Sequence, residues 1–376
     1  MTGPANGRDD GAATGWRGTL RRMHSVEGAR NGENNGRDRF SMGELAVVCS
    51  HYDLGVIESV HEFPRGSRRA PKVLLRTSRG PMLLKRRAPG RDDPHRVAFS
   101  HELQLHLHAA GFPAPEIIGT RAANNTLLQA GGHVYELFRY VPGEDYDRSE
   151  ESTADAGALL ARLHRLLGGF APTFPPPSGS FHARPAVVDA LRHGGRLPTD
   201  PPARSALRQL RHHYEAAAQA VDRAGYGSWP VQVVHGDWHP GNMVFRSRRV
   251  AAVVDFDSAC VAPTQADAAA GALQFSITRG RGRPGQWPAE LDLGRLGAFY
   301  RGCREERGRP PDHPEVIPDL MVEVLIAETI APIAATGTFG GLDAGEFLSM
   351  ALRKADWLRS NAGEVARAAS GERQGG

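Results

Sequence analysis

HGDWHPGNMVFRSRRVAAVVDFDSAC, residues 235–260, is the stretch that decides how the rest of the chain is interpreted. It gathers two histidines, three aspartates and an asparagine around short apolar runs, with a proline and a glycine between the polar groups. The packing of a core gives no reason to concentrate charged side chains in this way. The stretch is therefore a candidate site or an unusually crowded turn.

The spacing of these polar residues fits phosphoryl transfer. A protein that catalyses this reaction orients a hydroxyl group, holds a metal ion on the nucleotide phosphates and neutralises developing charge. Asp237 is suited to face the hydroxyl, and Asn242, five positions later, is suited to bind the metal. Asp255 follows the apolar run VAAVV and is a second candidate ligand. Because magnesium prefers hard oxygen ligands, we expect Mg²⁺ at Asn242 and Asp255.

Length and composition limit the alternatives. A chain of 376 residues can form one large domain or two lobes. The net charge of +4 is small and the basic residues are scattered, so no nucleic-acid partner is expected. No apolar run is long enough to span a bilayer, and the first residues carry no hydrophobic secretion signal. Together with three widely separated cysteines, these features predict a cytoplasmic protein that does not associate with membranes.

The sequence pattern changes along the chain in a way that predicts two lobes with a crevice between them. Residues 1–42 are rich in Gly, Asn, Arg and Asp and are expected to be disordered. Residues 43–141 contain strand-like runs, with KVLLRT and PMLLKR on either side of the turn SRGP, and one helical pattern. Residues 142–362 are mainly helical around a small hairpin, and residues 363–376 are expected to form a flexible tail.

Lys85 is the upstream residue that phosphoryl transfer would need. It lies on the second arm of the predicted hairpin, where a lysine can reach the α and β phosphates of a nucleotide. Glu102, on the helix that follows, could orient it through an ion pair. The alternative is a solvated lysine on an edge strand beside Arg86 and Arg87. The loop at residues 235–260 favours the nucleotide-binding role.

The segments HGDWHPGN and VVDFDSAC resemble the catalytic and metal-binding signature of the aminoglycoside phosphotransferase and choline kinase superfamily. The flanking segments PMLLKR, FSHELQLHLHAAGFPAPEII and YELFRYVPGE are similar to the branch that contains bacterial homoserine kinases and spore-coat kinase-like proteins. The resemblance covers roughly residues 50–360. It implies an α+β, bilobed, protein-kinase-like fold with a small antiparallel sheet and one helix in the first lobe. It also implies ATP-dependent phosphorylation of a hydroxyl on an amino alcohol, a sugar or an aminoglycoside-like molecule.

The resemblance also implies roles for individual residues. Asp237 would orient the acceptor hydroxyl or accept its proton, and Asn242 and Asp255 would bind Mg²⁺. Lys85 would bind the phosphates of ATP with Glu102 as its partner. The other implied roles are main-chain contacts to adenine from a strand and hinge, by Glu136, Phe138 and Tyr140, and support of the catalytic loop, by His235 and by Asp267 as a helix N-cap.

Three departures from protein kinases argue that the acceptor is a small molecule. The chain has PRGSRR in place of a G-x-G-x-x-G motif, and DFD replaces DFG. Its A-P-E triplet, Ala114 to Glu116, lies far upstream of DFD, so no activation loop ends in this triplet. A catalytically inactive, kinase-like binding or structural protein remains the alternative.

Other interpretations of the histidines are weaker. His235, Asp237 and His239 could be ligands of a dinuclear metal hydrolase, but the upstream D-x-H that this class needs is present only in a loop before a helix, at residues 93–95. HELQLH, from His101, is close to a zinc protease motif. Its histidines are five residues apart, so they do not share a helix face and are expected at the surface.

Two further side-chain types allow two interpretations. Glu323 and Glu328 lie on one predicted helix and could receive a cationic substrate. They are five residues apart and do not share a face, so we expect them at the surface. Trp238 could form a wall of the acceptor pocket, but we expect it in the core.

Overall fold

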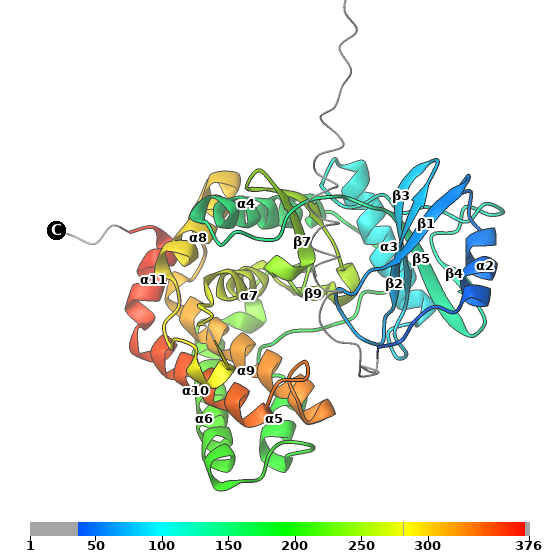
Figure 1. The fold of residues 1–376 in the computed structure, drawn as a ribbon. Coiled ribbons are helices and arrows are strands. Elements are labelled where there is room, and N and C mark those ends of the chain that lie inside the picture. The colour runs from blue at the N-terminus through cyan, green and yellow to red at the C-terminus, as the bar shows by residue number, and fades with distance from the viewer. Residues whose placement is uncertain (1–36, 281, 373–376) are drawn as a thin grey trace, which may run out of the picture. The chain divides into compact units, whose positions relative to one another are not determined.

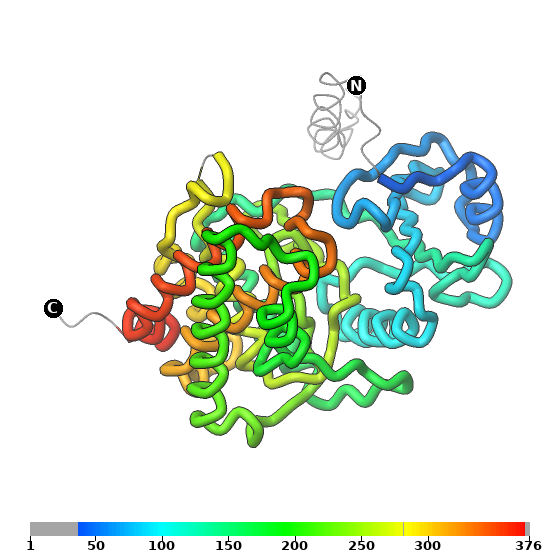
Figure 2. The backbone as a smooth tube through the Cα atoms, turned by 90° about the horizontal axis from the view of Figure 1, so that it is seen from below, coloured from blue at the N-terminus to red at the C-terminus, as the bar shows by residue number. Residues whose placement is uncertain are grey.

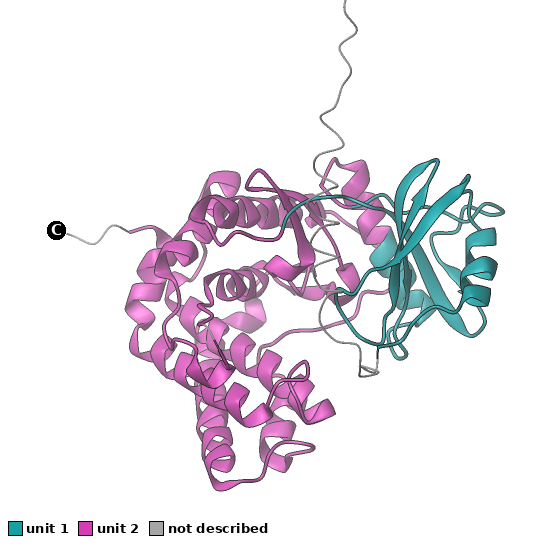
Figure 3. Cartoon of the chain, viewed as in Figure 1, with its two compact units in different colours: residues 1–101, 115–144 teal, residues 102–114, 145–376 magenta. Residues whose placement is uncertain are grey.

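The computed structural model describes residues 37–280 and 282–372 (Figure 1). The chain divides into two compact units, coloured separately in Figure 3. Unit 1 is formed by residues 1–101 and 115–144, and unit 2 by residues 102–114 and 145–376. The predicted disorder of residues 1–36 lies outside the described residues. No helix of the described part combines the length and apolar character that crossing a membrane requires.

Unit 1 contains a five-stranded antiparallel sheet in the order β1-β2-β3-β5-β4. The predicted hairpin is present, with Thr77 opposite Gly80 at its turn. The first strand has no clear sequence signal, because most of its side chains are exposed. The strands are β1 (Ile57–Glu62), β2 (Lys72–Thr77), β3 (Gly80–Arg86), β4 (Leu128–Ala130) and β5 (His133–Arg139).

Helix α2 (Met42–Ser50) is a feature of unit 1 that the sequence pattern did not reveal. It begins with a capping box, in which Ser41 accepts from the Glu44 amide and the Glu44 carboxylate accepts from the Ser41 amide. Leu45 and Val48 join the buried apolar cluster of the sheet. The helix is therefore stabilised by packing on the sheet despite its short length.

Helix α3 (Pro94–Ala109) contributes residues to both units, because unit 1 ends at His101 and unit 2 takes over at Glu102. Its predicted apolar positions are all buried: Val97, Phe99, Leu103 and Leu107. The chain leaves the helix at Gly111, which has a positive φ of 72°. The helix that the sequence predicts is therefore present, and it ends near the expected glycine.

Unit 2 is mainly helical (Figure 2). Its longer elements are α4 (Glu150–Leu167), α5 (Pro185–His193), α6 (Pro201–Arg223), α7 (Thr264–Ser276), α8 (Leu293–Arg307), α9 (Ile317–Thr336), α10 (Ala344–Ser360) and α11 (Ala362–Ser370). Helices α4 and α8 approach so closely that a Cβ atom added to Gly302 would lie 1.9 Å from the carbonyl oxygen of Ala154. Glycine is therefore required for this packing.

The predicted flexible tail is wrong for the residues that form α11. Val365 and Ala369 lie four positions apart on one face of this helix and are buried. The helix packs against α8, and the burial of these two side chains explains why the segment is ordered. Residues 373–376 lie outside the described part of the chain.

Two small antiparallel strand pairs in unit 2 position the loop at residues 235–260. Strand β6 (Val231–Val234) pairs with β9 (Cys260–Pro263), and β7 (Met243–Arg246) pairs with β8 (Arg249–Val253). The β6–β9 pairing places Val234 opposite Cys260. Residues 235–242 follow β6 and residues 254–259 precede β9, so this pairing holds the two segments side by side.

Candidate active site

The backbone brings Asn242 and Asp255 together. Residues 235–242 follow β6 and residues 254–259 precede β9, so the β6–β9 ladder aligns the two segments. The amide of Val254 donates to the carbonyl of Asn242 over 2.9 Å. Asp255 is the next residue along the chain, and it is thus fixed beside Asn242 by one main-chain hydrogen bond.

Asp237 and Asn242 are linked directly. The amide nitrogen of Asn242 donates to the carbonyl oxygen and to Oδ2 of Asp237, each over 3.0 Å. Both bonds use Nδ2, so the side-chain oxygen Oδ1 is the atom of Asn242 that is suited to bind a cation. Asn242 is buried, whereas the side chain of Asp237 is 37% exposed and accessible to a substrate.

The ionisation of Asp237 is controlled by its neighbours. Burial raises the pKa of its carboxyl, but the imidazole of His239 and the Asn242 amide outweigh this effect and lower the pKa overall. His239 Nδ1 accepts from the Gly241 amide over 2.9 Å, and its Nε2 lies 3.5 Å from Asp237 Oδ2. Asp237 is therefore held as an anion at neutral pH.

Asp255 adopts a backbone conformation that is uncommon for a residue with a side chain. Its φ and ψ are both 67°, in the left-handed region. This conformation costs about 1–2 kcal/mol for L-residues other than glycine, and such strain is concentrated at functional sites. Nearby, Gly236 has a φ of 74°, and a Cβ atom there would lie 2.3 Å from the Ser258 carbonyl oxygen. The backbone is therefore left-handed at Gly236 in the first segment of the loop and at Asp255 in the second.

Asp267 supports the loop from helix α7. Its carboxylate accepts from the amides of His235 over 3.2 Å and Gly236 over 3.0 Å, and from His164 Nε2 over 2.8 Å. Burial raises the pKa of Asp267, but the bond from His164 and these amides lower it overall. The predicted N-cap position is wrong, because α7 is capped by Pro263 and Asp267 lies within its first turn. The hydrogen bonds to the loop amides are nevertheless present.

His235 braces the loop from inside the core. It is fully buried, and its Nδ1 accepts from the Asp237 amide over 3.3 Å. Burial lowers the pKa of His235, so the imidazole is neutral and its Nδ1 can accept. The ring packs edge-on against Trp238, with the centroids 5.3 Å apart. Trp238 is 1% exposed, which confirms the prediction that it lies in the core.

In unit 1, the ion-pair partner of Lys85 is Glu136. The two residues face each other across β3 and β5, with Nζ 3.6 Å from Oε2. Glu136 is almost completely buried and also accepts from Arg87, over 2.8 and 2.7 Å, and from His101 Nε2 over 2.6 Å. Lys85 is itself buried, so it is not a solvated strand-end lysine.

The predicted pairing of Lys85 with Glu102 is wrong. The Glu102 carboxylate accepts from the amide and hydroxyl of Thr173 and from the Phe174 amide, at 2.8–3.3 Å. Consecutive residues of a helix point about 100° apart, so His101 and Glu102 cannot both face the sheet. His101 takes that position, which also corrects its predicted place at the surface.

The other two residues expected near adenine lie at the end of β5. Phe138 is opposite Leu83 within the sheet. Tyr140 follows the strand, and its amide donates to the carbonyl of Pro81 over 3.0 Å. The Tyr140 N–H is thus already used by the protein, and any main-chain contact of this segment to adenine stays a prediction.

The two glutamates of α9 are not surface residues, contrary to the prediction. Glu323 is completely buried, where its Oε1 accepts from the Ala183 amide over 2.9 Å and its Oε2 lies 3.1 Å from His182 Nδ1. Glu328 is partly buried and accepts a hydrogen bond from Gln274. The helix is apolar on all sides, so both carboxylates enter the interior with it.

The residues that would support a metal hydrolase have other roles. The carboxylate of Asp93 accepts from the Arg96 amide over 2.9 Å and thereby caps α3. Over the described residues, no group of three or more His, Cys, Asp or Glu side chains is arranged to hold a metal ion. Asn242 and Asp255 instead provide one amide and one carboxylate oxygen, the donors typical of a site completed by phosphate oxygens.

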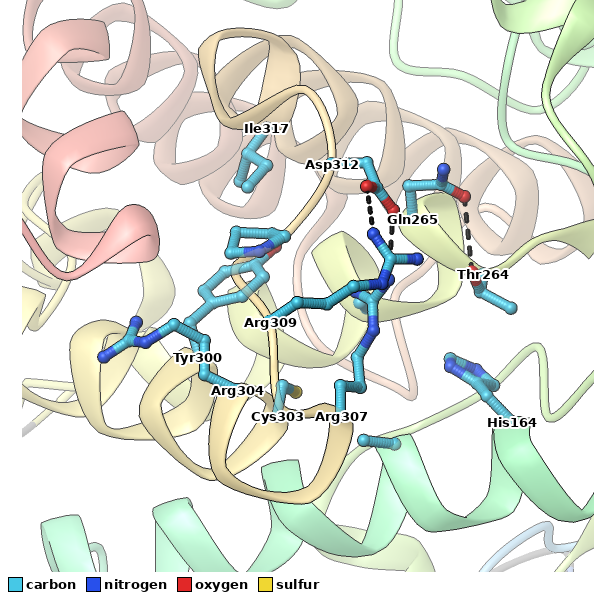
Figure 4. Close-up of a pocket in the computed structure, with 13 residues that line it drawn as sticks. His164, Thr264, Gln265, Tyr300, Cys303, Arg304, Arg307, Arg309, Asp312 and Ile317 are labelled. Carbon is cyan, nitrogen blue, oxygen red and sulfur yellow. Dashed lines mark hydrogen bonds and ion pairs between the residues drawn. The ribbon is translucent and has the colours of Figure 1, made fainter.

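A cavity near Asp267, the residue that accepts from the loop amides, is distinct from the candidate active site (Figure 4). Its wall includes His164, the imidazole that donates to Asp267. Figure 4 shows Arg307 and Arg309 pointing toward Asp312, and Asp312 pairs with both. The lining residues include none of the loop residues 235–260. The candidate active site is therefore the loop and not this cavity.

Comparison with known proteins assigns the family. The model of the phosphotransferase enzyme family, APH, matches residues 60–305. The chain belongs to this family. Curated relatives include the homoserine kinases of Xanthobacter autotrophicus, 26% identical over 220 residues, and Azorhizobium caulinodans, 27% identical over 224 residues. Each match covers 58% of this chain and 64% or 65% of the relative, so the chain spans just under two thirds of their length.

Solved structures share the fold of this phosphotransferase family member. A microcompartment-associated aminopropanol kinase gives a TM-score of 0.65 at 14% identity, covering 87% of this chain and 99% of that one. The amicoumacin kinase hAmiN gives 0.63 at 12% identity, with 86% and 93% covered. Choline kinase LicA from Streptococcus pneumoniae gives 0.58 at 14% identity, with 84% and 97% covered. The predicted α+β, kinase-like fold class is confirmed.

Proposed function

We propose that the protein is an ATP-dependent phosphotransferase that phosphorylates a hydroxyl group of a small molecule. The observation that carries the proposal is the linked arrangement of Asp237, Asn242 and Asp255. Asn242 bonds to the Asp237 side chain over 3.0 Å, and the Val254 amide ties Asn242 to the segment of Asp255. Membership of the phosphotransferase enzyme family supports the same reaction class.

In this proposal Asp237 acts on the acceptor. Its lowered pKa keeps the carboxylate ionised at neutral pH, so it can accept a hydrogen bond from the hydroxyl and orient that group for in-line attack. As the bond from the acceptor oxygen to the γ-phosphorus forms, the bond from that phosphorus to the β,γ-bridging oxygen breaks and releases ADP, and the hydroxyl proton passes to the Asp237 carboxylate. The Asn242 amide and the His239 imidazole fix the position of Asp237 during this step.

Asn242 and Asp255 would hold Mg²⁺ through Oδ1 of the amide and the carboxylate oxygens. These hard oxygen donors fit the ion, and the strained backbone at Asp255 is explained if the carboxylate must point to one place. A bound magnesium ion would neutralise charge on the phosphates of ATP. The Val254–Asn242 hydrogen bond keeps the two ligands together before any ion binds.

Lys85 would bind the nucleotide phosphates, with Glu136 rather than Glu102 as the residue that orients it. Glu136 is anchored by Arg87 and His101, so its carboxylate offers Lys85 a fixed partner. The end of β5, with Phe138 and Tyr140, is proposed to lie beside adenine. Because the ion pair with Glu136 already fixes the Lys85 ammonium group, less side-chain entropy is lost when ATP binds.

The relatives support an acceptor of low molecular mass. Their names describe kinases of homoserine, aminopropanol and choline, each of which carries a hydroxyl group. A catalytically inactive, kinase-like binding protein is the competing function. The presence of Asp237, Asn242, Asp255 and Lys85 in one chain favours the enzyme.

Replacing Asp237 tests the proposal. We expect Asp237→Asn to bind ATP with magnesium as the wild type does, in a thermal-shift measurement, because the side chain contacts the acceptor. Transfer of labelled phosphate from ATP to a pool of hydroxylated metabolites should fall by about 10²–10⁴-fold. Asp189→Asn, at a carboxylate that is 73% exposed, is the matched control and should leave transfer unchanged. Nucleotide binding without transfer by the wild type would favour the inactive protein.

A further inference from the structure

The cavity near Asp267 carries an excess of positive charge (Figure 4). Its walls come from α4, α7, α8, the start of α9 and the segment between α8 and α9, so it lies within unit 2. The lining side chains include three guanidinium groups and one carboxylate: Arg304, Arg307, Arg309 and Asp312. The proposed phosphoryl transfer uses none of these groups, so their charge needs another explanation.

Two of the arginines share the single carboxylate. Arg307 Nη2 lies 3.0 Å from Asp312 Oδ2, and Arg309 Nη1 pairs with Asp312 Oδ1. Arg304 is directed elsewhere, because its Nη1 donates to the Ala369 carbonyl over 3.1 Å. A guanidinium group has five N–H donors, more than one shared carboxylate can accept. Two cations and one anion therefore leave one unit of positive charge here, together with N–H donors beyond those that contact Asp312.

Tyr300 adds a neutral hydrogen-bond donor to the same wall. It is 2% exposed, and its hydroxyl has no hydrogen-bond partner among the described residues. Burial raises the pKa of this phenol well above its usual value, so the hydroxyl keeps its proton and can donate. The charge of Arg307 acts on Tyr300, which shows that the guanidinium and the phenol are neighbours. Because buried hydroxyls in native proteins are normally bonded, this one indicates an acceptor that the chain itself does not supply.

We propose that this cavity binds a small oxyanion, the phosphate or carboxylate group of a metabolite, at a site separate from the candidate active site. Arg307 and Arg309 bind its oxygen atoms through the planar pairs of N–H groups that guanidinium offers to such anions. The anion balances the positive charge that Asp312 leaves, and it gives the Tyr300 hydroxyl an acceptor. Both effects favour the occupied cavity over the empty one.

One side chain joins this cavity to the candidate active site. His164 lines the cavity, and its Nε2 donates to Asp267 over 2.8 Å. Asp267 in turn accepts from the amides of His235 and Gly236. A ligand that binds only the folded wall makes local opening of that wall rarer, so these two amides exchange with solvent more slowly when the anion is bound. The anion thereby acts as an effector of the loop at residues 235–260.

Titration of inorganic phosphate into the full chain, followed by ³¹P NMR, tests the site. The titration contains no nucleotide, and chloride keeps the ionic strength constant. It is carried out in Lys85→Met, so that the proposed nucleotide site contributes less to the binding. Succinate is then added as a competitor. Displacement of phosphate by succinate shows that the site accepts either group, whereas phosphate that stays bound assigns the site to phosphate alone.

Replacing single lining residues identifies where the phosphate binds. We expect Arg307→Gln to weaken phosphate binding about 10- to 100-fold, the effect of a charged hydrogen bond. Arg309→Gln, at a side chain that is 58% exposed, should also weaken it and serves if Arg307→Gln does not fold. Tyr300→Phe changes no charge and should weaken binding about fivefold. Arg192→Gln is the matched control, because it removes the same charge from a side chain that is 54% exposed on α5.

Hydrogen exchange of the loop in the same Lys85→Met background tests the effector role. Saturating phosphate should slow exchange at His235 and Gly236, and it should have no such effect once Arg307→Gln is added. Absence of phosphate binding, or equal losses in Arg307→Gln and Arg192→Gln, overturns the site. Unchanged exchange with phosphate bound overturns the effector role. Because these measurements use neither ATP nor an acceptor, a failure to transfer phosphate contradicts the proposed function and leaves the oxyanion site standing.

Discussion

Lys85 and Glu136 form a buried ion pair across neighbouring strands, and Glu136 has further partners besides Lys85. Its carboxylate lies 3.6 Å from Lys85 Nζ, and it also accepts from Arg87 and His101 over 2.6–2.8 Å. Burial alone would raise the pKa of Glu136, but the charges of Lys85 and Arg87 and the hydrogen bond from His101 hold it well below its usual value. The pair is therefore asymmetric: the glutamate supports the sheet, and the lysine is the member that can be exchanged.

The two sides of this pair should respond differently to substitution. Lys85→Met should stay folded, because Glu136 keeps its bonds to Arg87 and His101, but its nucleotide affinity should fall about 10- to 100-fold. Glu136→Gln leaves buried cations without an anion and should lower the free energy of unfolding by about 3–5 kcal/mol. Urea unfolding and nucleotide titration of both variants measure the two effects. Equal losses of stability in the two variants would contradict the asymmetry.

The sequence was sufficient to predict which residues lie together where those residues are close in the chain. Asp237, Asn242 and Asp255 are separated only by a short hairpin, so spacing alone predicted that they would be brought together. The partner of Lys85 could not be predicted in this way. It depends on which face of α3 meets the sheet, and that choice placed His101 rather than Glu102 against Glu136.

Helix α9 shows a second limit of local patterns. Glutamates five positions apart were expected at the surface, but the helix is apolar on every side and most of its residues are buried. Their polar partners, His182 and Gln274, come from segments far away in the sequence. Periodicity carries no information about such partners, because they are set by tertiary packing.

Asp255 allows a test of the proposed metal site that does not depend on the acceptor. Asparagine tolerates the left-handed conformation, so Asp255→Asn should fold normally. It lacks the charge, and the magnesium concentration needed for half-maximal nucleotide stabilisation should rise at least about tenfold. Thermal shift at fixed ATP with increasing magnesium measures this requirement. An unchanged requirement in Asp255→Asn would remove Asp255 from the metal site, and Asp189→Asn controls for loss of an exposed carboxylate.

The contact between α4 and α8 should be intolerant of any side chain. A Cβ atom at Gly302 would lie 1.9 Å from the Ala154 carbonyl oxygen, and one at Gly157 would lie 2.0 Å from that of Phe299. Backbone cannot move aside as a flexible side chain can, so Gly302→Ala should lower the free energy of unfolding by about 2 kcal/mol or more. Gly169→Ala, just beyond the end of α4, has open space around the new methyl group and should be nearly neutral. Chemical unfolding of both variants makes the comparison, and similar midpoints would mean that the helices separate at little cost.

His182 should make the stability of the protein depend on pH near neutrality. Burial alone would lower its pKa, but the Glu323 carboxylate 3.1 Å away outweighs burial and raises it above 6.5. A histidine with a raised pKa in the folded state binds its proton more tightly there than when unfolded. Its contribution to stability is therefore complete below pH 6.5 and is lost as the pH rises through the folded-state value.

The pKa of Glu323 is also raised, chiefly by burial, so this carboxyl too favours the folded state more at low pH. The free energy of unfolding should accordingly fall between pH 6 and pH 8, and His182→Gln should show a smaller fall. Urea midpoints at the two pH values measure the difference. His193→Gln, at a histidine whose side chain is 73% exposed, should keep the wild-type dependence. If wild type and His182→Gln lose stability in parallel over this range, the His182–Glu323 pair is not the source of the pH dependence.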